Sequence, residues 1–349
     1  MTRSMMPSTI VLLSVAGTLV AFAGCGASNI PSPEATSGTP AASAAHSAPP
    51  AQPATRFSWP DGGRPAVSRE MTGLDEAYIN PGAVIEDDGT WHMYANLFTN
   101  WPGDVQTVHL TSADGAEWTL AQDTPVLDSD DVPFARPGFD VSTGFIAPDG
   151  TWVLVFATVS ISEPSEIGIA TGPGADGPWT VAPEPVLSGA AGSWDAGGLA
   201  WPSVVPTDEG FAMYYSTYAT NPKETVIARA ISDDGMTWTK EDQPALEPAV
   251  GWEGTGLDRP RAVRVDDGYA MVYSGSDLTD RGVAFSTDGA TWERDGDAPA
   301  ITMEDFPVDG RSWDAALIER DGVLTYYLEI GTATASIGTE VYRATAPLP

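Results

Sequence analysis

Residues 80–94 read NPGAVIEDDGTWHMY, and related strings occur at four later places in the 349-residue chain. Each copy puts an Asp-Gly or Glu-Gly pair between two short apolar runs, which is the signal of a β-hairpin. The turn glycines are Gly89, Gly150, Gly210, Gly268 and Gly322, separated by 61, 60, 58 and 54 residues. This even spacing indicates one hairpin-based unit repeated five times.

A second turn follows the first four copies. It reads SADGAEW at 112–118, ADGPW at 175–179, SDDGMTW at 232–238 and STDGATW at 286–292. We expect the Asp and Gly to form a tight turn into an outer strand, and the Trp to pack between neighbouring sheets. The fifth copy lacks this turn because the chain ends at Pro349. Residues 57–60, which contain Trp59, are predicted to supply the missing outer strand.

Repeats of this length, with about four strands each, are typical of β-propeller blades. Five blades account for residues 56–349 and leave no room for a second folded domain. The predicted fold class is therefore all-β, a five-bladed β-propeller closed by an N-terminal strand. A β-sandwich is the alternative, but it explains neither the even spacing nor the recurring Trp.

The first 25 residues resemble a bacterial lipoprotein signal peptide. Arg3 supplies a positive charge, residues 10–22 are apolar, and small residues precede Cys25, the only cysteine. The apolar run is too short to span a bilayer. We expect export and acylation of Cys25, which would anchor the chain at the outer face of a bacterial cell membrane through the lipid alone. Ordinary secretion is the alternative.

Residues 26–55 are almost entirely Ala, Pro, Ser, Gly and Thr. Such a segment cannot bury enough apolar surface to offset its chain entropy, so it is predicted to be a disordered linker. It would hold the propeller away from the membrane.

Charge and composition limit the partners. The chain has 48 acidic and 16 basic residues, and its formal net charge is −32 at pH 7. Nucleic acid is excluded as a partner because binding a polyanion needs clustered Lys and Arg. No cofactor or metal is expected, since His46 lies in the linker and His92 and His109 have no partner at metal-ligand spacing. We expect a monomer.

Three strings carry a resemblance to known proteins. They are YINPGAVIEDDGTWHMY at 78–94, SWDAGGLAWPSVVPTDEGFAMYYS at 193–216 and GWEGTGLDRPRAVRVDDGYAMVYSG at 251–275. Together with the SxDGxxW turns, they resemble the five-bladed propellers of glycoside hydrolase families 32, 43, 68 and 130. The resemblance covers residues 56–349 and implies that the innermost strands bring carboxylates into one pocket. There, one carboxyl protonates the leaving oxygen while another activates water or attacks the sugar.

Seven acidic residues are candidates for this pair. They are Asp75 and Glu76 in blade one, Asp140 in blade two, Asp195 in blade three, Glu253 and Asp258 in blade four, and Asp314 in blade five. Asp140 and Asp258 share the position ten residues before the turn glycine. Asp195 and Glu253 share the position fifteen before it, each directly after a Trp.

We hypothesise that Asp258 or Asp195 is the general acid. The resemblance supports Asp258, because in family 43 the acid often lies two residues before a blade proline, although in the third blade rather than the fourth. Asp140 is the first choice for the base or nucleophile, ahead of the two blade-one acids, and Glu253 is expected to tune its neighbours by like-charge coupling. The alternative is that these acids cap turns or pair with arginines.

Further residues are expected to contact substrate. They are Asn80, Trp201, Arg259, Arg261 and Asp314. The hydrolase families often have an Asp where this chain has Asn80, and the string that follows looks like family 130, in which that Asn contacts substrate. Sugars stack on flat rings, which makes Trp201 the first candidate for a subsite wall, ahead of Trp194, Trp252 and Trp313. Arg259 and Arg261 could hold the phosphate of a family-130 phosphorylase, but an exported enzyme has little access to phosphate.

The sequence therefore predicts a cell-surface glycoside hydrolase that acts on an extracellular oligosaccharide or polysaccharide. A non-catalytic glycan-binding lipoprotein, favoured by Asn80, is the second interpretation, and a protein-interaction scaffold is the third. Two acids facing each other across the channel would favour hydrolysis. An aromatic groove with acids paired to Arg would favour binding, and a flat face without a pocket would favour the scaffold.

Overall fold

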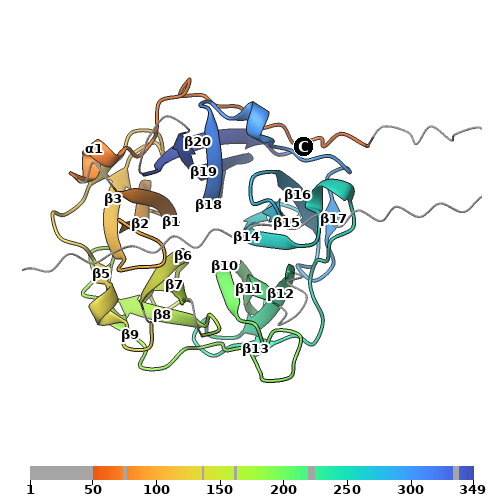
Figure 1. Cartoon of the computed structure of the whole chain (residues 1–349). Coiled ribbons are helices and arrows are strands. Elements are labelled where there is room, and N and C mark those ends of the chain that lie inside the picture. The colour runs from red at the N-terminus through yellow and green to blue at the C-terminus, as the bar shows by residue number, and fades with distance from the viewer. Residues whose placement is uncertain (1–49, 74–76, 136, 161–162, 219–224, 333–337) are drawn as a thin grey trace, which may run out of the picture. The chain divides into compact units, whose positions relative to one another are not determined.

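The computed structural model describes residues 50–73, 77–135, 137–160, 163–218, 225–332 and 338–349. Five antiparallel sheets stand around a common centre (Figure 1), and each sheet runs outward in chain order from its innermost strand. The predicted all-β, five-bladed propeller is confirmed. Within the described ranges, no helix has the length and apolar character needed to cross a bilayer.

The strands follow the predicted repeat. Blade one contains β1 (Tyr78–Asp87), β2 (Thr90–Phe98), β3 (Gln106–Ser112) and β4 (Thr119–Leu120), with β5 (Leu127–Asp128) paired to β3. Blade two contains β6 (Gly138–Ile146), β7 (Trp152–Val159), β8 (Ile167–Gly172) and β9 (Thr180–Val181). Blade three contains β10 (Leu199–Thr207), β11 (Gly210–Tyr218), β12 (Thr225–Ser232) and β13 (Thr239–Lys240). Blade four contains β14 (Leu257–Val265), β15 (Gly268–Gly275), β16 (Arg281–Ser286) and β17 (Glu293–Arg294). Blade five contains β18 (Gly310–Arg320), β19 (Val323–Thr332) and β20 (Glu340–Pro347), and the short helix α1 (Arg69–Thr72) precedes blade one.

The repeated glycines join the first strand to the second in every blade. Gly89 and Gly150 have φ values of 80° and 88°, which only glycine adopts without steric cost. The SxDGxxW turns join the third strand to the fourth. In the blade-three turn, Ser232 Oγ accepts from the N–H of Gly235, and Asp234 Oδ1 accepts from two further backbone N–H groups, each bond measuring 2.8 Å. Both turn predictions are confirmed.

The apolar side chains of adjacent blades form a shared core between them. The turn Trp contributes as predicted: Trp118 of blade one lies edge-on against Tyr327 of blade five, with ring centroids 5.6 Å apart. The Tyr327 hydroxyl also donates to a turn carbonyl of blade one at 2.6 Å. Between blades two and three, Val153 and Met213 belong to one buried cluster. Each blade is therefore held by its two neighbours.

The two ends of the propeller are joined in the fifth blade. The N–H of Ser58 donates to the Thr345 carbonyl at 2.8 Å, and the N–H of Thr345 donates back at 2.9 Å. Trp59 packs edge-on against Phe306, with centroids 6.1 Å apart. The prediction that residues 57–60 close the ring is confirmed.

Contacts with the propeller begin before the expected linker boundary at residue 55. The carbonyl of Ala51 accepts from the N–H groups of Asp297 and Ala298 at 2.8 and 3.1 Å. The Asp295 carboxylate accepts from the backbone N–H groups of residues 54 and 55 at 2.9 and 2.7 Å. Residues 51–55 therefore lie along the loop after β17, because their backbone groups find partners there.

Candidate active site

A β-bulge of one or two residues interrupts the innermost strand of every blade at the same place. The register shifts fall between Asn80 and Ala83, Val141 and Thr143, Ala200 and Ser203, Asp258 and Arg261, and Ser312 and Ala315. A bulge breaks the strict alternation of a strand and redirects side chains. Trp201 and Arg259 lie in these bulges with φ values of 56° and 50°. Side chains rarely tolerate such values, and backbone strain of this kind concentrates at functional sites.

The bulges surround a pocket of about 230 Å³ at one end of the central channel. Its lining residues are Tyr78, Asn80, Phe98, Trp101, Asp140, Trp201, Arg259, Trp313, Asp314 and Glu329. All five blades contribute. The pocket therefore brings together three carboxyl groups, one guanidinium group and a set of aromatic rings.

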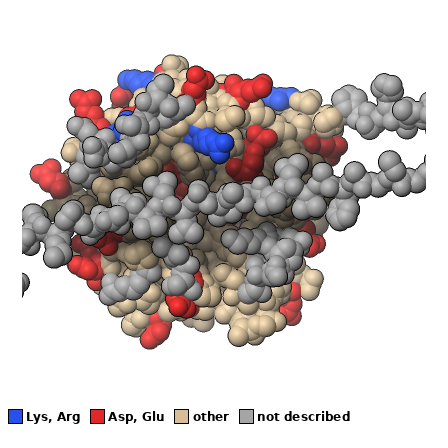
Figure 2. All heavy atoms as spheres, viewed as in Figure 1, with Lys and Arg blue, Asp and Glu red and all other residues tan. Residues whose placement is uncertain are grey.

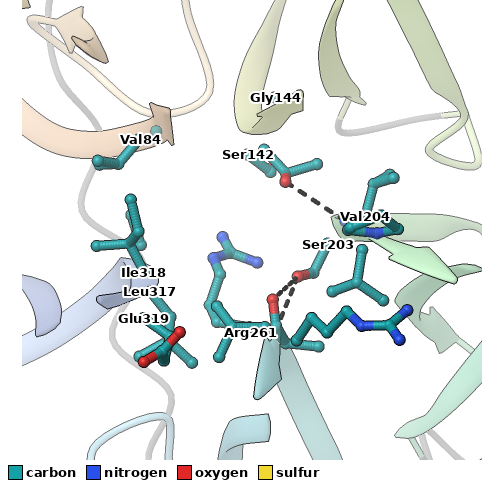
Figure 3. A pocket seen from close by; sticks show the side chains of 17 residues that line it. Val84, Ser142, Gly144, Ser203, Val204, Arg261, Leu317, Ile318 and Glu319 are labelled. Carbon is teal, nitrogen blue, oxygen red and sulfur yellow. Dashed lines mark hydrogen bonds between the residues drawn. The ribbon is translucent and has the colours of Figure 1, made fainter. Parts of the chain in front are cut away.

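Arg261 separates this pocket from a second cavity of about 190 Å³ at the other end of the channel. Figure 3 shows that second cavity, with Val84, Val204 and Leu317 placed around it by three different blades. Its lining contains only one carboxylate, that of Glu319, so it cannot supply a catalytic pair. The Arg261 side chain is 2% exposed, and its guanidinium pairs with the carboxylate of Asp314.

The two oxygens of Asp314 lie in different surroundings. Oδ1 accepts from the Arg261 guanidinium and, at 2.7 Å, from the N–H of Ala315. Oδ2 is buried in the pocket wall and has no hydrogen-bond partner among the described residues. A carboxylate that is clamped through one oxygen and unpartnered at the other can accept a proton or attack a sugar carbon.

Asp140 lies at the end of a chain of amide hydrogen bonds and is fully buried. Asn80 Nδ2 donates to Asp140 Oδ2 at 2.7 Å, and Asn96 Nδ2 donates to Asn80 Oδ1 at 2.7 Å. Burial raises the pKa of Asp140 well above its usual value, and the charge of Asp314 raises it further; the Asn80 hydrogen bond offsets only part of this. A carboxyl group whose pKa is raised keeps its proton to higher pH than usual and is suited to general acid catalysis.

Glu329 is a pocket acid that was not expected from the sequence, because only acids preceding the turn glycine were considered. Glu329 lies on the second strand of blade five, seven residues after Gly322, where blade one has Asn96 after Gly89. Burial, followed by the charge of Asp314, raises the pKa of Glu329 to about 8. Glu329 Oε2 accepts the Asp314 N–H at 3.1 Å. Blades one and three also have a polar residue seven positions after the glycine, Asn96 and Thr217, and this was the signal that could have identified it.

Asp258 lies beside the pocket rather than in its lining. Its Oδ2 is 3.3 Å from Arg259 Nη1, and its Oδ1 accepts the backbone N–H of Arg259 at 2.9 Å. The Arg259 guanidinium lies 4.3 Å from the ring centroid of Trp201. Arg259 and Trp201 therefore face the pocket, and Asp258 supports the arginine; that the two residues contact substrate stays a prediction. The structure gives no support to Asp258 as the general acid.

The structure does not bring Asp195 and Glu253 to the pocket. Asp195 accepts from Lys240 Nζ at 2.6 Å, and Glu253 accepts from Arg294 Nε at 2.7 Å. Burial alone would raise the pKa of both acids, but these cations and further hydrogen bonds lower it. Lys240 and Arg294 lie on the outermost strands of blades three and four, so each acid ties the loop before its blade to the blade's outer edge. Their predicted catalytic roles are thus corrected to ion pairing, the alternative raised from the sequence.

The aromatic residues divide in a similar way. Trp201 and Trp313 line the pocket as predicted, whereas Trp252 stacks on Tyr273 and Trp194 packs against the core between blades two and three. Trp101, on the loop after β2, was missed. Its ring lies 6.2 Å from that of Trp201 at an interplanar angle of 24°, so the two form a wall against which a sugar could stack.

Three residues named from the sequence, Cys25, Asp75 and Glu76, lie outside the described residues. In the part of the chain that the structure describes, no three His, Cys, Asp or Glu side chains are arranged so that they could hold a metal ion. His92 and His109 contact each other instead, with Nδ1 and Nε2 2.9 Å apart. On the face drawn in Figure 2, Asp and Glu outnumber Lys and Arg, and no basic patch is seen.

Part of the chain is similar in sequence to a known family. Residues 200–332 match the family model of β-1,4-mannooligosaccharide phosphorylase, a segment that includes Arg259, Asp314 and Glu329. No curated protein sequence matches the chain. The family match is a similarity over residues 200–332 of the 349-residue chain, and the solved glycoside hydrolases described next share its propeller fold.

Several solved structures share the fold. A thermostable family-43 glycoside hydrolase has a TM-score of 0.61 at 15% identity, covering 76% of this protein and 89% of that one. A second structure comes from work on GH130 mannoside phosphorylases and the glycoside hydrolases among them that target β-1,2 mannosidic linkages in Candida mannan. It has a TM-score of 0.59 at 17% identity, covering 84% and 96%. A family-117 glycoside hydrolase from the marine bacterium Zobellia galactanivorans has a TM-score of 0.59 at 13% identity, covering 84% and 90%.

Proposed function

We propose that this protein hydrolyses glycosidic bonds in an extracellular oligosaccharide or polysaccharide, with Asp140 as the general acid and Asp314 as the base or nucleophile. One observation carries the proposal: two carboxyl groups of the same pocket have opposite surroundings. Asp140 is buried with a raised pKa, whereas Asp314 is paired with Arg261 through one oxygen and unpartnered at the other. Glycoside hydrolysis requires such a division between one proton donor and one charged carboxylate.

The reaction follows from these two groups. Asp140 gives its proton to the glycosidic oxygen as the bond from that oxygen to the anomeric carbon breaks. Asp314 Oδ2 either takes a proton from the attacking water or first bonds to the anomeric carbon itself; in the second case water then breaks that bond and gives its proton to Asp140, which restores both carboxyl groups. Glu329, which is protonated below a pH of about 8, can donate a hydrogen bond to a sugar hydroxyl. This scheme gives Asp140 the acid role, whereas the sequence suggested the base, because the raised pKa of Asp140 depends on burial and on acids from blade five.

The charges of the pocket favour hydrolysis over phosphorolysis. Among the described residues, Arg259 is the only basic side chain that lines the pocket, and it is paired with Asp258. Arg261 is committed to Asp314 and to backbone carbonyls, including that of Pro260 at 2.8 Å. A phosphate would therefore meet no cation that is free of a carboxylate partner among the described residues that line the pocket.

The experiment is to incubate the purified protein with a panel of neutral polysaccharides and follow released sugars by NMR, with and without inorganic phosphate. We expect a reducing sugar whose release does not depend on phosphate. Asp140→Asn and Asp314→Asn should each lower the rate by about 10³-fold or more, while Asp258→Asn, the matched control, should lower it by less than about tenfold. A sugar 1-phosphate as the product would refute hydrolysis. Binding without any product would favour the glycan-binding alternative.

The proposal extends to where the enzyme acts. The N-terminal sequence supports export, acylation of Cys25 and attachment of a monomeric propeller to the outer face of a bacterial membrane through its linker. In cells given an alkyne-tagged fatty acid, the protein should be labelled and a Cys25→Ser variant should not. Equal labelling of the two would contradict the anchor.

A further inference from the structure

A third cavity, called the groove below, adjoins the active-site pocket and shares Trp313 with it. This cavity has a volume of about 570 Å³, more than twice that of the pocket. Its lining residues are Met303, Glu304, Asp309, Gly310, Arg311, Trp313 and Gly331. The Trp313 ring therefore stands between the catalytic carboxyls on one side and an open groove of blade five on the other.

The position of Trp313 is fixed by its surroundings, although its side chain is 37% exposed. Arg281, which is fully buried, donates to the Trp313 carbonyl at 3.1 Å and to Ser312 Oγ at 2.9 Å. The other acceptors of Arg281 are also neutral oxygens. Burying a guanidinium that has no carboxylate partner lowers the stability of the fold. Gly331 leaves room for the indole, because a Cβ there would lie 2.7 Å from the ring. These contacts fix the backbone at Trp313 and leave space beside Gly331 for its partly exposed ring.

Exposed apolar side chains gather along the same path. The large apolar side chains that are exposed among the described residues are Trp101, Ile231, Met303, Trp313 and Val323. Trp101 and Trp313 line the pocket, and Trp313 and Met303 line the groove. Exposed apolar side chains that cluster around a cavity mark a binding surface. A row of such side chains suits a sugar chain, whose C–H faces pack on apolar surfaces while its hydroxyls remain in water.

The charges of the groove disfavour one class of sugar chain. The groove has two carboxylates, Glu304 and Asp309, against one cation, Arg311, and the lining of the adjoining pocket offers no unpaired cation among the described residues. A glycan rich in uronic acid or sulfate would be repelled by this arrangement, whereas a neutral glycan would not.

We propose that this groove binds the part of the substrate that extends beyond the cleaved bond, so that the substrate is a neutral glycan several units long. The proposal rests on the function proposed above. One sugar unit lies between Asp140 and Asp314, and the glycan continues past Trp313 toward Met303 and Arg311.

The test measures affinity against glycan length. Asp140→Asn, which replaces a carboxyl group by an amide of the same shape and stops turnover, is titrated calorimetrically with neutral oligosaccharides of increasing length. The series are β-1,4-mannan, β-1,2-mannan and arabinan fragments. For the series bound best, we expect affinity to rise about tenfold from two units to five. Adding Met303→Ala or Arg311→Ala should remove most of that gain, while Ile231→Ala, an exposed apolar side chain on β12, should leave it intact.

The outcomes separate this inference from the proposed function, provided that hydrolysis by the unmodified protein is measured in parallel. Affinity that does not change with length, or a gain that survives both groove variants, overturns the groove even if hydrolysis occurs. A length-dependent gain that the groove variants remove supports the groove even if the unmodified protein releases no sugar. Failure of every series to bind overturns both.

Discussion

Arg261→Met is the substitution that most sharply separates a structural arginine from a phosphate ligand. Arg261 and Asp314 have side chains that are each 2% exposed, and the guanidinium also donates to three backbone carbonyls. Removing one partner of a buried pair leaves the other charge uncompensated and costs about 3–5 kcal/mol. Since whole domains are stable by about 5–15 kcal/mol, the variant should unfold at a much lower urea concentration. Its turnover should also fall, because Asp314 loses its clamp.

Two further variants make this prediction refutable. Arg261→Met with Asp314→Leu removes both charges and should be more stable than Arg261→Met alone, since apolar replacement of a complete buried pair is often neutral. Arg264→Met is the matched control, because Arg264 lines the cavity of Figure 3 but pairs with an exposed Asp208 at 2.7 Å. Arg264→Met should lower the free energy of unfolding by less than about 1 kcal/mol. If the free energy of unfolding of Arg261→Met lies within about 1 kcal/mol of that of the unmodified protein, the Arg261–Asp314 pair does not stabilise the fold as expected.

Three further predictions follow from the ion pairs, the buried acids and the closure. Asp195→Asn and Glu253→Gln should lower stability toward unfolding by urea at pH 7 and leave kcat within about threefold; a large loss of kcat in either would restore its catalytic role. Because Lys240 and Arg294 outweigh burial and lower the pKa of these acids, the stabilisation should be present above the unfolded pKa of about 4 and lost as the pH falls below it. For Glu329 the pH dependence of folding stability has the opposite sign. Its pKa of about 8 means that, below this pH, the folded state keeps a proton which the unfolded state has lost. Folding stability should therefore fall by about 1 kcal/mol per pH unit between about pH 4.5 and 8, and Glu329→Gln should lessen that fall; an unchanged slope would contradict the raised pKa. Deleting residues 50–60 should lower the Tm by about 5 °C or more, because blade five loses its outer strand, whereas an unchanged Tm would show that the closure contributes nothing.

The sequence predicted the fold well because the information was local and repeated. Turn glycines and SxDGxxW turns recur at nearly constant spacing, so the strand order of each blade follows from hairpin chemistry alone. The closure was also predictable. Blade five lacks the Trp of the SxDGxxW turn, and Trp59 supplies one from the N-terminal side. The linker boundary was less certain, because residues 51–55 are held by backbone hydrogen bonds to the loop after β17 and not by apolar side chains.

The site was predicted less completely because its chemistry depends on contacts between blades. Asp140 and Asp258 occupy the same sequence position, but the bulges differ, and it is Arg259 that enters the pocket from blade four. Asp195 and Glu253 also look equivalent to catalytic acids in the sequence, and only the structure shows the cations that neutralise them. The raised pKa of Asp140 arises from burial and from acids of blade five, which no local pattern reveals.

The division of roles between Asp140 and Asp314 is tested most directly by changing the leaving group. The substrates are aryl glycosides of the sugar released in the NMR assay, one with a poor leaving group and one with a dinitrophenolate leaving group that needs no protonation. Asp140→Asn should hydrolyse the first at least about 10³-fold more slowly than the unmodified protein and the second nearly as fast. Asp314→Asn should fail on both. Equal losses on both substrates for Asp140→Asn, or recovery by Asp314→Asn on the activated substrate, would contradict the account.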